Sequence, residues 1–239
     1  MTEPSPKRRV LAGLAGVARA LGNEHRLEIL EHLAQGERSV DALAAVVGLP
    51  VANASQHLQQ LRRGGLVVAR REGRQIVYRL AEGPVVAAIT ALREIAEANV
   101  AEVRTVVSDY YSNMDALEPV TNDELLRRLE SGTATLLDVR PEDEFAAGHI
   151  PGALNIPLAA LETRIAEIGR DRDVVAYCRG PYCILSFEAV RLLREKGYRI
   201  RRLKDGYPEW RAEGRKIETR TMAGVDGRPG RVRTSDEPR

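Results

Sequence analysis

The chain has 239 residues, of which 44% are apolar and 29% are charged, and its formal net charge is +2. This length accommodates one large domain or two modest ones, each able to bury a core. The composition excludes disordered and fibrous classes. No apolar run approaches the roughly 18 residues of a bilayer-spanning helix, and the segment from Met1 to Arg9 lacks the apolar stretch of a signal peptide, so we expect a cytoplasmic protein.

The first third of the chain predicts a series of short helices. Apolar residues recur at helical spacing, Asn23 and Ser39 are suited to begin helices as N-caps, and Gly36 and Gly48 are suited to end them. Residues 1–10 are polar, rich in charge and lead into the first helix. The expected helices cover roughly residues 10–21, 24–35, 40–47 and 51–63.

After Gly65 the apolar period changes from 3.6 to 2. Leu66–Ala69 and Ile76–Tyr78 alternate as strands do, and the charged turn Arg71–Arg74 separates them, so the pattern predicts a β-hairpin. Helices followed by a hairpin indicate a winged helix-turn-helix. A long helical pattern then covers residues 84–111, and its apolar surface exceeds that of a lone solvent-facing helix. We therefore expect it to be buried or to pack in a dimer.

The second helix of the helix-turn-helix, residues 51–63, is expected to enter the major groove of DNA. Ala54, Leu58 and Leu61 would face the core, leaving a polar face whose amides can bind base edges. Residues 55–80 contain six arginines and one glutamate, a local charge of +5 suited to phosphates. The predicted DNA-binding residues are Asn53, Ser55, Gln56, His57, Gln59 and Arg62 of the helix, with Arg71 and Arg74 of the wing.

The segments 20–30 (ALGNEHRLEIL), 53–61 (NASQHLQQL) and 65–80 together resemble the ArsR family of winged-helix repressors. The resemblance covers about residues 12–110. It implies binding to double-stranded operator DNA and a homodimer built from the first and last helices, which would account for the apolar residues of 84–111. For His57, contact with DNA and support of the turn both remain open.

One departure from that family concerns metals. Its metal-sensing members carry a cysteine motif where this chain has Glu37–Asp41, and no cysteine precedes Cys178. A thiolate metal sensor in this half is therefore disfavoured. His25, His32 and His57 are better interpreted as packed or surface residues than as ligands, and the predicted protein has no metal site and no cofactor.

The second half alternates helical and strand patterns. A helix at 122–129 precedes an apolar strand at 134–139, and further strands are expected at 153–156, 174–177 and 199–203 with helices between them. Such alternation predicts an α/β domain with a mostly parallel sheet covered on both faces. Residues 113–119 are interpreted as a junction, and residues 219–239, with almost no large apolar residue, as a disordered tail.

The only two cysteines, Cys178 and Cys183, flank a short loop between the 174–177 strand and a helix that starts near Leu185. Ligands of open α/β sheets bind at the carboxyl ends of the strands, and a helix N-terminus favours a thiolate. Backbone N–H groups of the loop and the Arg179 charge could stabilise a thiolate or persulfide anion. The predicted loop residues are Arg179, Gly180, Pro181 and Tyr182.

The segments 136–140 (LLDVR), 148–157 (GHIPGALNIP) and 205–210 (DGYPEW) resemble a rhodanese domain, over about residues 119–217. The resemblance implies that Cys178 carries sulfur. Asp138 and Arg140 are interpreted as a pair that braces the loop, and His149 as a turn residue. The predicted organisation is thus a mainly α winged helix-turn-helix domain at 1–112, a rhodanese-like domain at 119–217 and the tail at 219–239.

This loop departs from active rhodaneses at its sixth position, where Cys183 replaces the usual arginine. Thiosulfate binding is in doubt, and Cys183 could instead resolve a persulfide on Cys178 as a disulfide or polysulfide. The loop is also one residue shorter than the Cys-x5-Arg loop of phosphatase and arsenate-reductase relatives. Two alternatives stay open at this point: cysteines that only pack, and a zinc site that uses both thiols and a histidine.

The main hypothesis is a dimeric transcriptional regulator whose rhodanese-like domain senses or transfers sulfane sulfur through Cys178, assisted by Cys183. Its partners would be operator DNA and a sulfane-sulfur donor or thiol acceptor, with no membrane. One alternative is a sulfurtransferase whose DNA-binding domain regulates its own operon. A repressor with an inert rhodanese module is the other.

Overall fold

The computed structural model describes residues 4–112, 118–220 and 232–234. The chain divides into two compact units, Met1–Val85 and Val86–Arg239. Within the described ranges no helix is both long and apolar enough to cross a membrane. The predicted junction at 113–119 lies outside these ranges except for Glu118 and Pro119.

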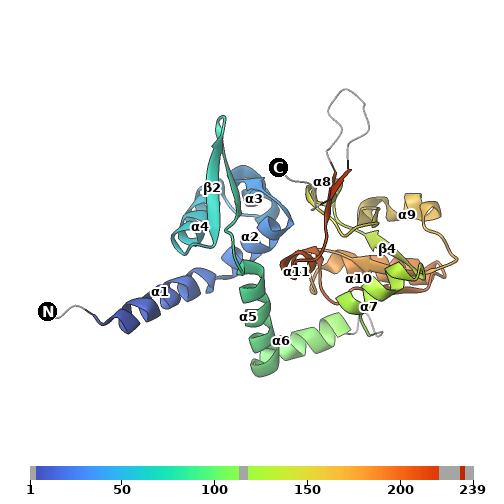
Figure 1. Cartoon of the computed structure of the whole chain (residues 1–239), viewed down its shortest axis with the longest axis horizontal. Helices are drawn as coiled ribbons and strands as arrows, with labels where there is room; N and C mark the ends of the chain where they lie inside the picture. Colours follow the sequence, from blue (N-terminus) through green and yellow to red (C-terminus); the bar gives the residue numbers. More distant parts are fainter. Residues whose placement is uncertain (1–3, 113–117, 221–231, 235–239) are drawn as a thin grey trace. The chain divides into compact units, whose positions relative to one another are not determined.

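The described part of the first unit, residues 4–85, contains four helices before Val85 and a three-stranded sheet (Figure 1). The predicted caps are confirmed: Asn23 accepts a hydrogen bond from the Arg26 N–H, and Ser39 from the Ala42 N–H. The part of α1 nearest the N-terminus projects away from the other helices. The elements are α1 (Pro6–Leu21), α2 (Glu24–Gln35), β1 (Arg38–Ser39), α3 (Val40–Val47), α4 (Val51–Arg63), β2 (Val67–Glu72) and β3 (Gln75–Leu80).

The wing is an antiparallel sheet of order β1-β3-β2. Glu72 pairs with Gln75 next to the turn, so the hairpin is longer than the alternating apolar residues alone indicate. Gly73 adopts a φ of +59°, a backbone conformation that favours glycine and permits the tight turn. Strand β1 was not predicted, because two residues are too short to produce a period.

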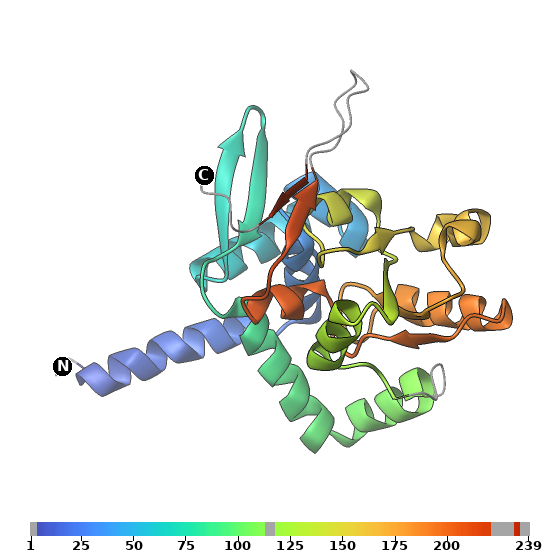
Figure 2. The same ribbon diagram turned by 45° about the vertical axis from the view of Figure 1, so that its right-hand side comes forward.

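The predicted helix at 84–111 is broken into three pieces, which is a correction to the single helix expected. They are α5 (Val85–Asn99), α6 (Ala101–Val106) and the π-helix η1 (Val107–Ser112). Val100 is extended, with φ −103° and ψ 112°, and α5 and α6 meet there at an angle (Figure 2). The Asn99 amide donates to the Ile95 carbonyl and Arg104 to the Ala98 carbonyl, so side chains satisfy carbonyls at the break.

The second unit is built on a parallel sheet of order β5-β4-β6-β7. Side chains alternate along the strands: Leu137 and Ala176 join one core with α10, whereas Leu136 and Val175 join another with α7 and α11. The predicted α/β fold with both faces covered is confirmed. The strands are β4 (Ala134–Asp138), β5 (Leu154–Asn155), β6 (Asp173–Tyr177) and β7 (Ile200–Arg202); the α-helices are α7 (Asn122–Glu130), α8 (Glu142–Ala147), α9 (Leu161–Arg164), α10 (Ile184–Glu195) and α11 (Tyr207–Ala212), with 3-10 helices η2 (Leu158–Ala160) and η3 (Ile165–Glu167).

Two short parts of the segment predicted as a disordered tail form strands instead. Strand β8 (Glu218–Arg220) pairs antiparallel with β9 (Val232–Thr234), and Glu218 also bridges to His149. Backbone pairing rather than apolar burial orders these residues, so composition carried no signal for them. Residues 221–231 and 235–239 lie outside the described part of the chain.

Candidate functional site

Helix α4 presents the polar face that its sequence predicts. Ala54, Leu58 and Leu61 are buried in the first unit. The side chains on the opposite side include exposed and half-buried amides and hydroxyls suited to base edges. Of the predicted residues, Asn53, Gln56, Gln59, Arg62, Arg71 and Arg74 are exposed, while Ser55 and His57 are half-buried.

The arginines of the wing differ in how far they are free to bind phosphate. Arg70 donates to Glu37 at 2.6 Å and also pairs with Glu72 at 3.2 Å, so carboxylates already compensate its charge. Arg71 instead donates to the Gly73 carbonyl at 3.2 Å. The local charge counted from the sequence therefore overstates the charge available to a ligand.

His57 lies beside His25 of α2, with the ring centroids 5.6 Å apart. Partial burial lowers the pKa of His57, and the charge of Arg26 lowers it further. These contacts are those of a residue that supports the junction of α2 and α4. They favour the supporting role among the two that the sequence left open.

Cys178 follows β6 directly, and Cys183 is the N-cap of α10. A disulfide joins them, with their Cα atoms 6.2 Å apart, within the usual range for such a bond. Only 1% of Cys178 and 8% of Cys183 are exposed. The two sulfurs are thus brought together at the carboxyl edge of the sheet, as the loop length predicts.

The loop between the cysteines is held by its own backbone and by the 205–207 segment. The Cys183 N–H donates to the Gly180 carbonyl at 3.2 Å, and the Tyr207 N–H donates to the Cys178 carbonyl at 3.1 Å. A Cβ at Gly206 would lie 2.4 Å from the Gly180 nitrogen. Only glycine at position 206 allows this close approach of the two backbones. The Cys183 N–H already donates to the Gly180 carbonyl, so this N–H is not available to stabilise an anion on Cys178.

The charge of Arg179 is compensated by a carboxylate of α8. Its guanidinium donates to both carboxylate oxygens of Glu144, at 2.9 and 2.8 Å, and Glu144 is buried. Such a bidentate pair compensates both charges. Glu144 was not predicted as a partner, since its position in α8 carries no local signal of this contact.

Asp138 and Arg140 form the predicted pair, and both are fully buried. Arg140 Nη2 lies 2.6 Å from Asp138 Oδ2 and donates to the Gly148 carbonyl at 2.8 Å. The guanidinium also stacks over the Tyr207 ring, 4.4 Å from its centroid. The nearby Asp138 carboxylate raises the pKa of Arg140 despite its burial. The pair therefore joins β4, the 148–149 turn and the 205–207 segment that touches the cysteine loop.

His149, predicted as a turn residue, is buried and forms a β-bridge with Glu218. Its Nδ1 lies 2.9 Å from the Phe145 carbonyl, and its ring stacks on Phe145 with centroids 3.7 Å apart. Nε2 lies 3.4 Å from Glu218. Burial lowers the pKa of His149. No group of three or more His, Cys, Asp or Glu side chains in the described residues is arranged to hold a metal ion.

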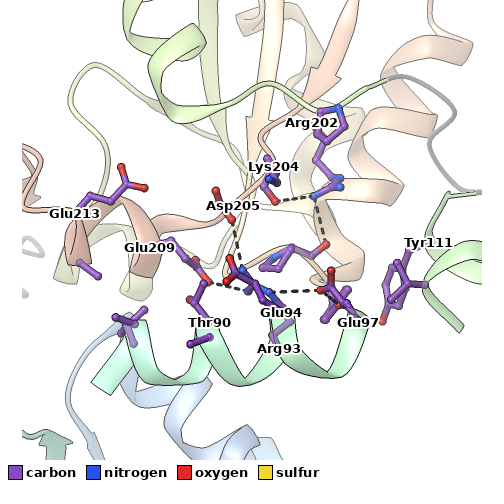
Figure 3. A pocket seen from close by; sticks show the side chains of 18 of the residues that line it. Thr90, Arg93, Glu94, Glu97, Tyr111, Arg202, Lys204, Asp205, Glu209 and Glu213 are labelled. Carbon is purple, nitrogen blue, oxygen red and sulfur yellow. Dashed lines mark hydrogen bonds and ion pairs between the residues drawn. The ribbon is translucent and has the colours of Figure 1, made fainter. Parts of the chain in front are cut away.

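Helix α5 supplies two charged residues that were not predicted, Arg93 and Glu97, and Figure 3 shows Arg93 reaching toward Asp205 and Glu209. The Tyr182 hydroxyl donates to Glu97. Arg93 lies 3.2 Å from Glu209 and 3.6 Å from Asp205. All these residues belong to the second unit. The apolar periodicity of a sequence predicts local structure, so it does not predict contacts between residues this far apart in the chain.

Comparisons with known proteins agree with both halves of this description. The family model for a helix-turn-helix domain matches residues 21–70, and that for a rhodanese-like domain matches residues 121–213. The HTH-type transcriptional regulator Rv0324 of Mycobacterium tuberculosis is 46% identical over 212 residues, which cover 89% of this chain and 93% of that protein. The chain belongs to the ArsR-type winged-helix transcriptional regulators that carry a C-terminal rhodanese-like domain.

Two further relatives each match one half of this regulator. A sulfurtransferase of Allochromatium vinosum is 36% identical over 97 residues, covering 40% of this chain and 89% of that protein. The solved winged helix-turn-helix DNA-binding domain Mb0332 of Mycobacterium bovis is 39% identical, with a TM-score of 0.39, and the match covers 43% of this chain and 94% of that one.

Proposed function

We propose that this transcriptional regulator binds operator DNA through α4 and the wing and responds to sulfane sulfur through Cys178 and Cys183. The observation that carries the proposal is the pair of buried cysteines on one six-residue loop, close enough to bond, at the carboxyl edge of the sheet. A rhodanese-like loop with a second thiol in place of the closing arginine is suited to sensing, because the second thiol can resolve a persulfide.

The chemistry has two steps. The Cys178 thiolate attacks a sulfane sulfur of a polysulfide, whose S–S bond breaks, and the shortened polysulfide leaves with the electron pair. The Cys183 thiolate then attacks Cys178 Sγ, and the terminal sulfur leaves as hydrosulfide. The two cysteines lose two electrons in total, and the sulfane sulfur gains them. Two equivalents of an external thiol restore the dithiol by exchange.

The DNA-binding residues are proposed from their exposure on α4 and the wing. Amides of Asn53, Gln56 and Gln59 would contact bases, and Arg62, Arg71 and Arg74 would contact phosphates or the minor groove. Ser55 is retained as a lesser contact, and His57 as a supporting residue.

A homodimer is part of the proposal. Large apolar side chains are exposed along α1, including Leu11, Leu14 and Val17, and along α5, including Leu92 and Ile95. Such apolar rows are typical of surfaces that a second copy covers. A dimer would place two recognition helices on two operator half-sites. We also propose that residues 1–112 act as the DNA-binding and dimerisation part and residues 119–217 as the sulfur-responsive part.

The test is the affinity of the purified protein for its own upstream DNA, measured by fluorescence anisotropy after treatment with dithiothreitol or inorganic tetrasulfide. We expect binding to weaken by about tenfold or more on sulfur treatment, within the usual span of allosteric coupling. Cys178→Ser should bind DNA equally in both conditions. Cys183→Ser should accumulate a persulfide that intact mass detects as one added sulfur. Equal affinity of the native protein in both states would contradict the proposal.

The likeness to a protein named as a sulfurtransferase favours one alternative, an enzyme that passes sulfur to a thiol acceptor. In that case thiosulfate or polysulfide turnover with cyanide would be fast, and DNA affinity would not depend on the thiols. An inert rhodanese module is the other alternative. Its signature would be a Cys178→Ser variant unchanged in both sulfur chemistry and DNA response.

A further inference from the structure

Helix α5 contacts the cysteine loop and also the segment that packs on that loop. Glu97 accepts a hydrogen bond from the hydroxyl of Tyr182, the residue directly before Cys183. Arg93 pairs with Glu209 of α11 at 3.2 Å and with Asp205 at 3.6 Å (Figure 3). Arg93 also lies 3.7 Å from Glu97, one turn along the same helix. The two contacts thus share one charged pair on α5.

The carboxylates that Arg93 holds belong to the segment that packs on the loop. Glu209 Oε2 accepts from the Gly206 N–H at 3.0 Å. Gly206 in turn lies against the backbone of Arg179 and Gly180. Arg93 and Glu209 are largely buried, with 17% and 13% of their side chains exposed. Their attraction is therefore screened less than that of a surface pair.

The hydroxyl of Tyr182 is held in a setting where it keeps its proton. Partial burial and the adjacent Glu97 carboxylate both raise the pKa of Tyr182. A cavity of about 560 Å³ borders the contact, and Tyr182, Phe187 and Thr90 are among its lining residues. The Tyr182 ring therefore borders this cavity, and it also packs against Tyr111, with ring centroids 5.0 Å apart.

We propose that Glu97 and Arg93 are positioning residues that make α5 respond to the state of the Cys178–Cys183 loop. This inference rests on the proposed function, because it states how the redox state of the two cysteines is transmitted to α5. In the disulfide, the bond to Cys178 restrains Cys183 and so holds Tyr182 on Glu97. Reduction by a dithiol moves two electrons and two protons to the cysteines and removes that restraint. The Tyr182 hydroxyl can then leave the Glu97 carboxylate. Glu97 then competes with Glu209 and Asp205 for an ion pair with Arg93.

The consequence reaches the DNA-binding half through the chain itself. Helix α5 begins at Val85, five residues after strand β3 of the wing ends at Leu80, and Val85 is the last residue of the first unit. A change in the flexibility or position of α5 can therefore reach the wing through the backbone that joins them. Its exposed Leu92 and Ile95 also belong to the proposed dimer surface, so the same change would alter the spacing of the recognition helices.

The test is amide hydrogen exchange of peptides covering residues 85–99 in the full chain, fully reduced with dithiothreitol or fully oxidised with diamide. Driving both states to completion, checked by intact mass, removes any dependence on sulfur uptake. In the native protein we expect exchange of α5 to differ by about fivefold between the states, the lower end of usual coupling energies. In Tyr182→Phe and Glu97→Gln the difference should fall below about twofold.

The matched control is Glu94→Gln, a change of the same type on the same helix, at a residue that lines the cavity. It should keep the full difference between the states. Thermal unfolding of each variant separates a positioning role from a structural one, because a merely structural loss would shift the melting temperature without removing the dependence on the thiols.

Two results would overturn the inference. One is an identical exchange pattern of α5 in the reduced and oxidised native protein. The other is a full difference retained by Tyr182→Phe and Glu97→Gln. If α5 responds to the thiols while DNA affinity ignores polysulfide, the positioning role stands and the proposed function fails. The two failures are thus distinguishable.

Discussion

The two halves of this regulator hold their functional groups in opposite ways. On α4 and the wing the candidate residues are exposed, except for the half-buried Ser55 and His57, and the opposite side of α4 is buried. Around the cysteines, Asp138 and Arg140 form a fully buried pair, and the buried Glu144 pairs with Arg179, whose side chain is 22% exposed. An exposed face can lose one side chain at little cost to stability. A buried network cannot, since a charge left without its partner is strongly destabilising.

The largest expected effect comes from breaking the buried pair. Asp138→Ala leaves Arg140 without its carboxylate and should lower the free energy of unfolding by about 3–5 kcal/mol. Urea unfolding measures it. Glu195→Ala, which breaks the exposed Arg191–Glu195 pair, is the control and should cost no more than about 1 kcal/mol. Similar small costs for both changes would contradict the contrast between the two halves.

Overpacking at the loop should have the next largest effect. Gly206→Ala would place a Cβ 2.4 Å from the Gly180 nitrogen, so the loop must shift. We expect a loss of about 1–3 kcal/mol in unfolding free energy together with slower sulfur uptake at Cys178. Gly13→Ala on α1, where a Cβ meets nothing within 4 Å, should be neutral or stabilising. Unchanged uptake in Gly206→Ala would show that the loop tolerates displacement.

The wing arginines allow a finer comparison within the DNA-binding half. Arg71→Ala should weaken DNA binding and reduce the slope of log affinity against log salt by about one, as for one lost phosphate contact. Arg70→Ala should change the slope less, because Glu37 and Glu72 already compensate its charge. Titrations at several salt concentrations measure both slopes. Equal slopes for the two variants would show that the Arg70 ion pairs open on binding.

The smallest effect concerns pH. Burial lowers the pKa of His149, whose ring is also faced by Glu218, Asp138 and Arg140. The folded protein then binds fewer protons than the unfolded chain, so its stability falls as the pH falls through the unfolded value of about 6.5. His149→Gln should flatten the fall in unfolding free energy between pH 7 and pH 5.5. An unchanged pH profile would mean that His149 is protonated as easily in the folded chain.

Much of the fold could be predicted from the sequence because its signals are local. Caps at Asn23 and Ser39, the alternation of the wing and the apolar strand before Cys178 each depend on a few neighbouring residues. The break at Val100 could not be predicted, since no proline or glycine marks it and the contacts found there are side-chain hydrogen bonds to carbonyls. The β8–β9 pair was likewise missed, because its order comes from backbone pairing.

The candidate site divides in the same way. Cys178, Cys183, Asp138 and Arg140 lie within short motifs, and the structure brings each pair together. The residues that contact the loop between the cysteines come from other elements. Glu144 on α8 compensates the charge of Arg179, and Glu97 on α5 accepts a hydrogen bond from Tyr182. One sequence contains no signal of such contacts.

The most direct test of the central claim is to separate one sample by its affinity for DNA and then to measure the intact mass of the protein in each fraction. Protein treated with enough tetrasulfide to modify half the molecules is passed over resin carrying its upstream DNA, and the bound and unbound fractions are analysed by intact mass. Our account predicts that the bound fraction contains the Cys178–Cys183 dithiol and the unbound fraction the persulfide or disulfide. The same distribution of sulfur states in both fractions would contradict it.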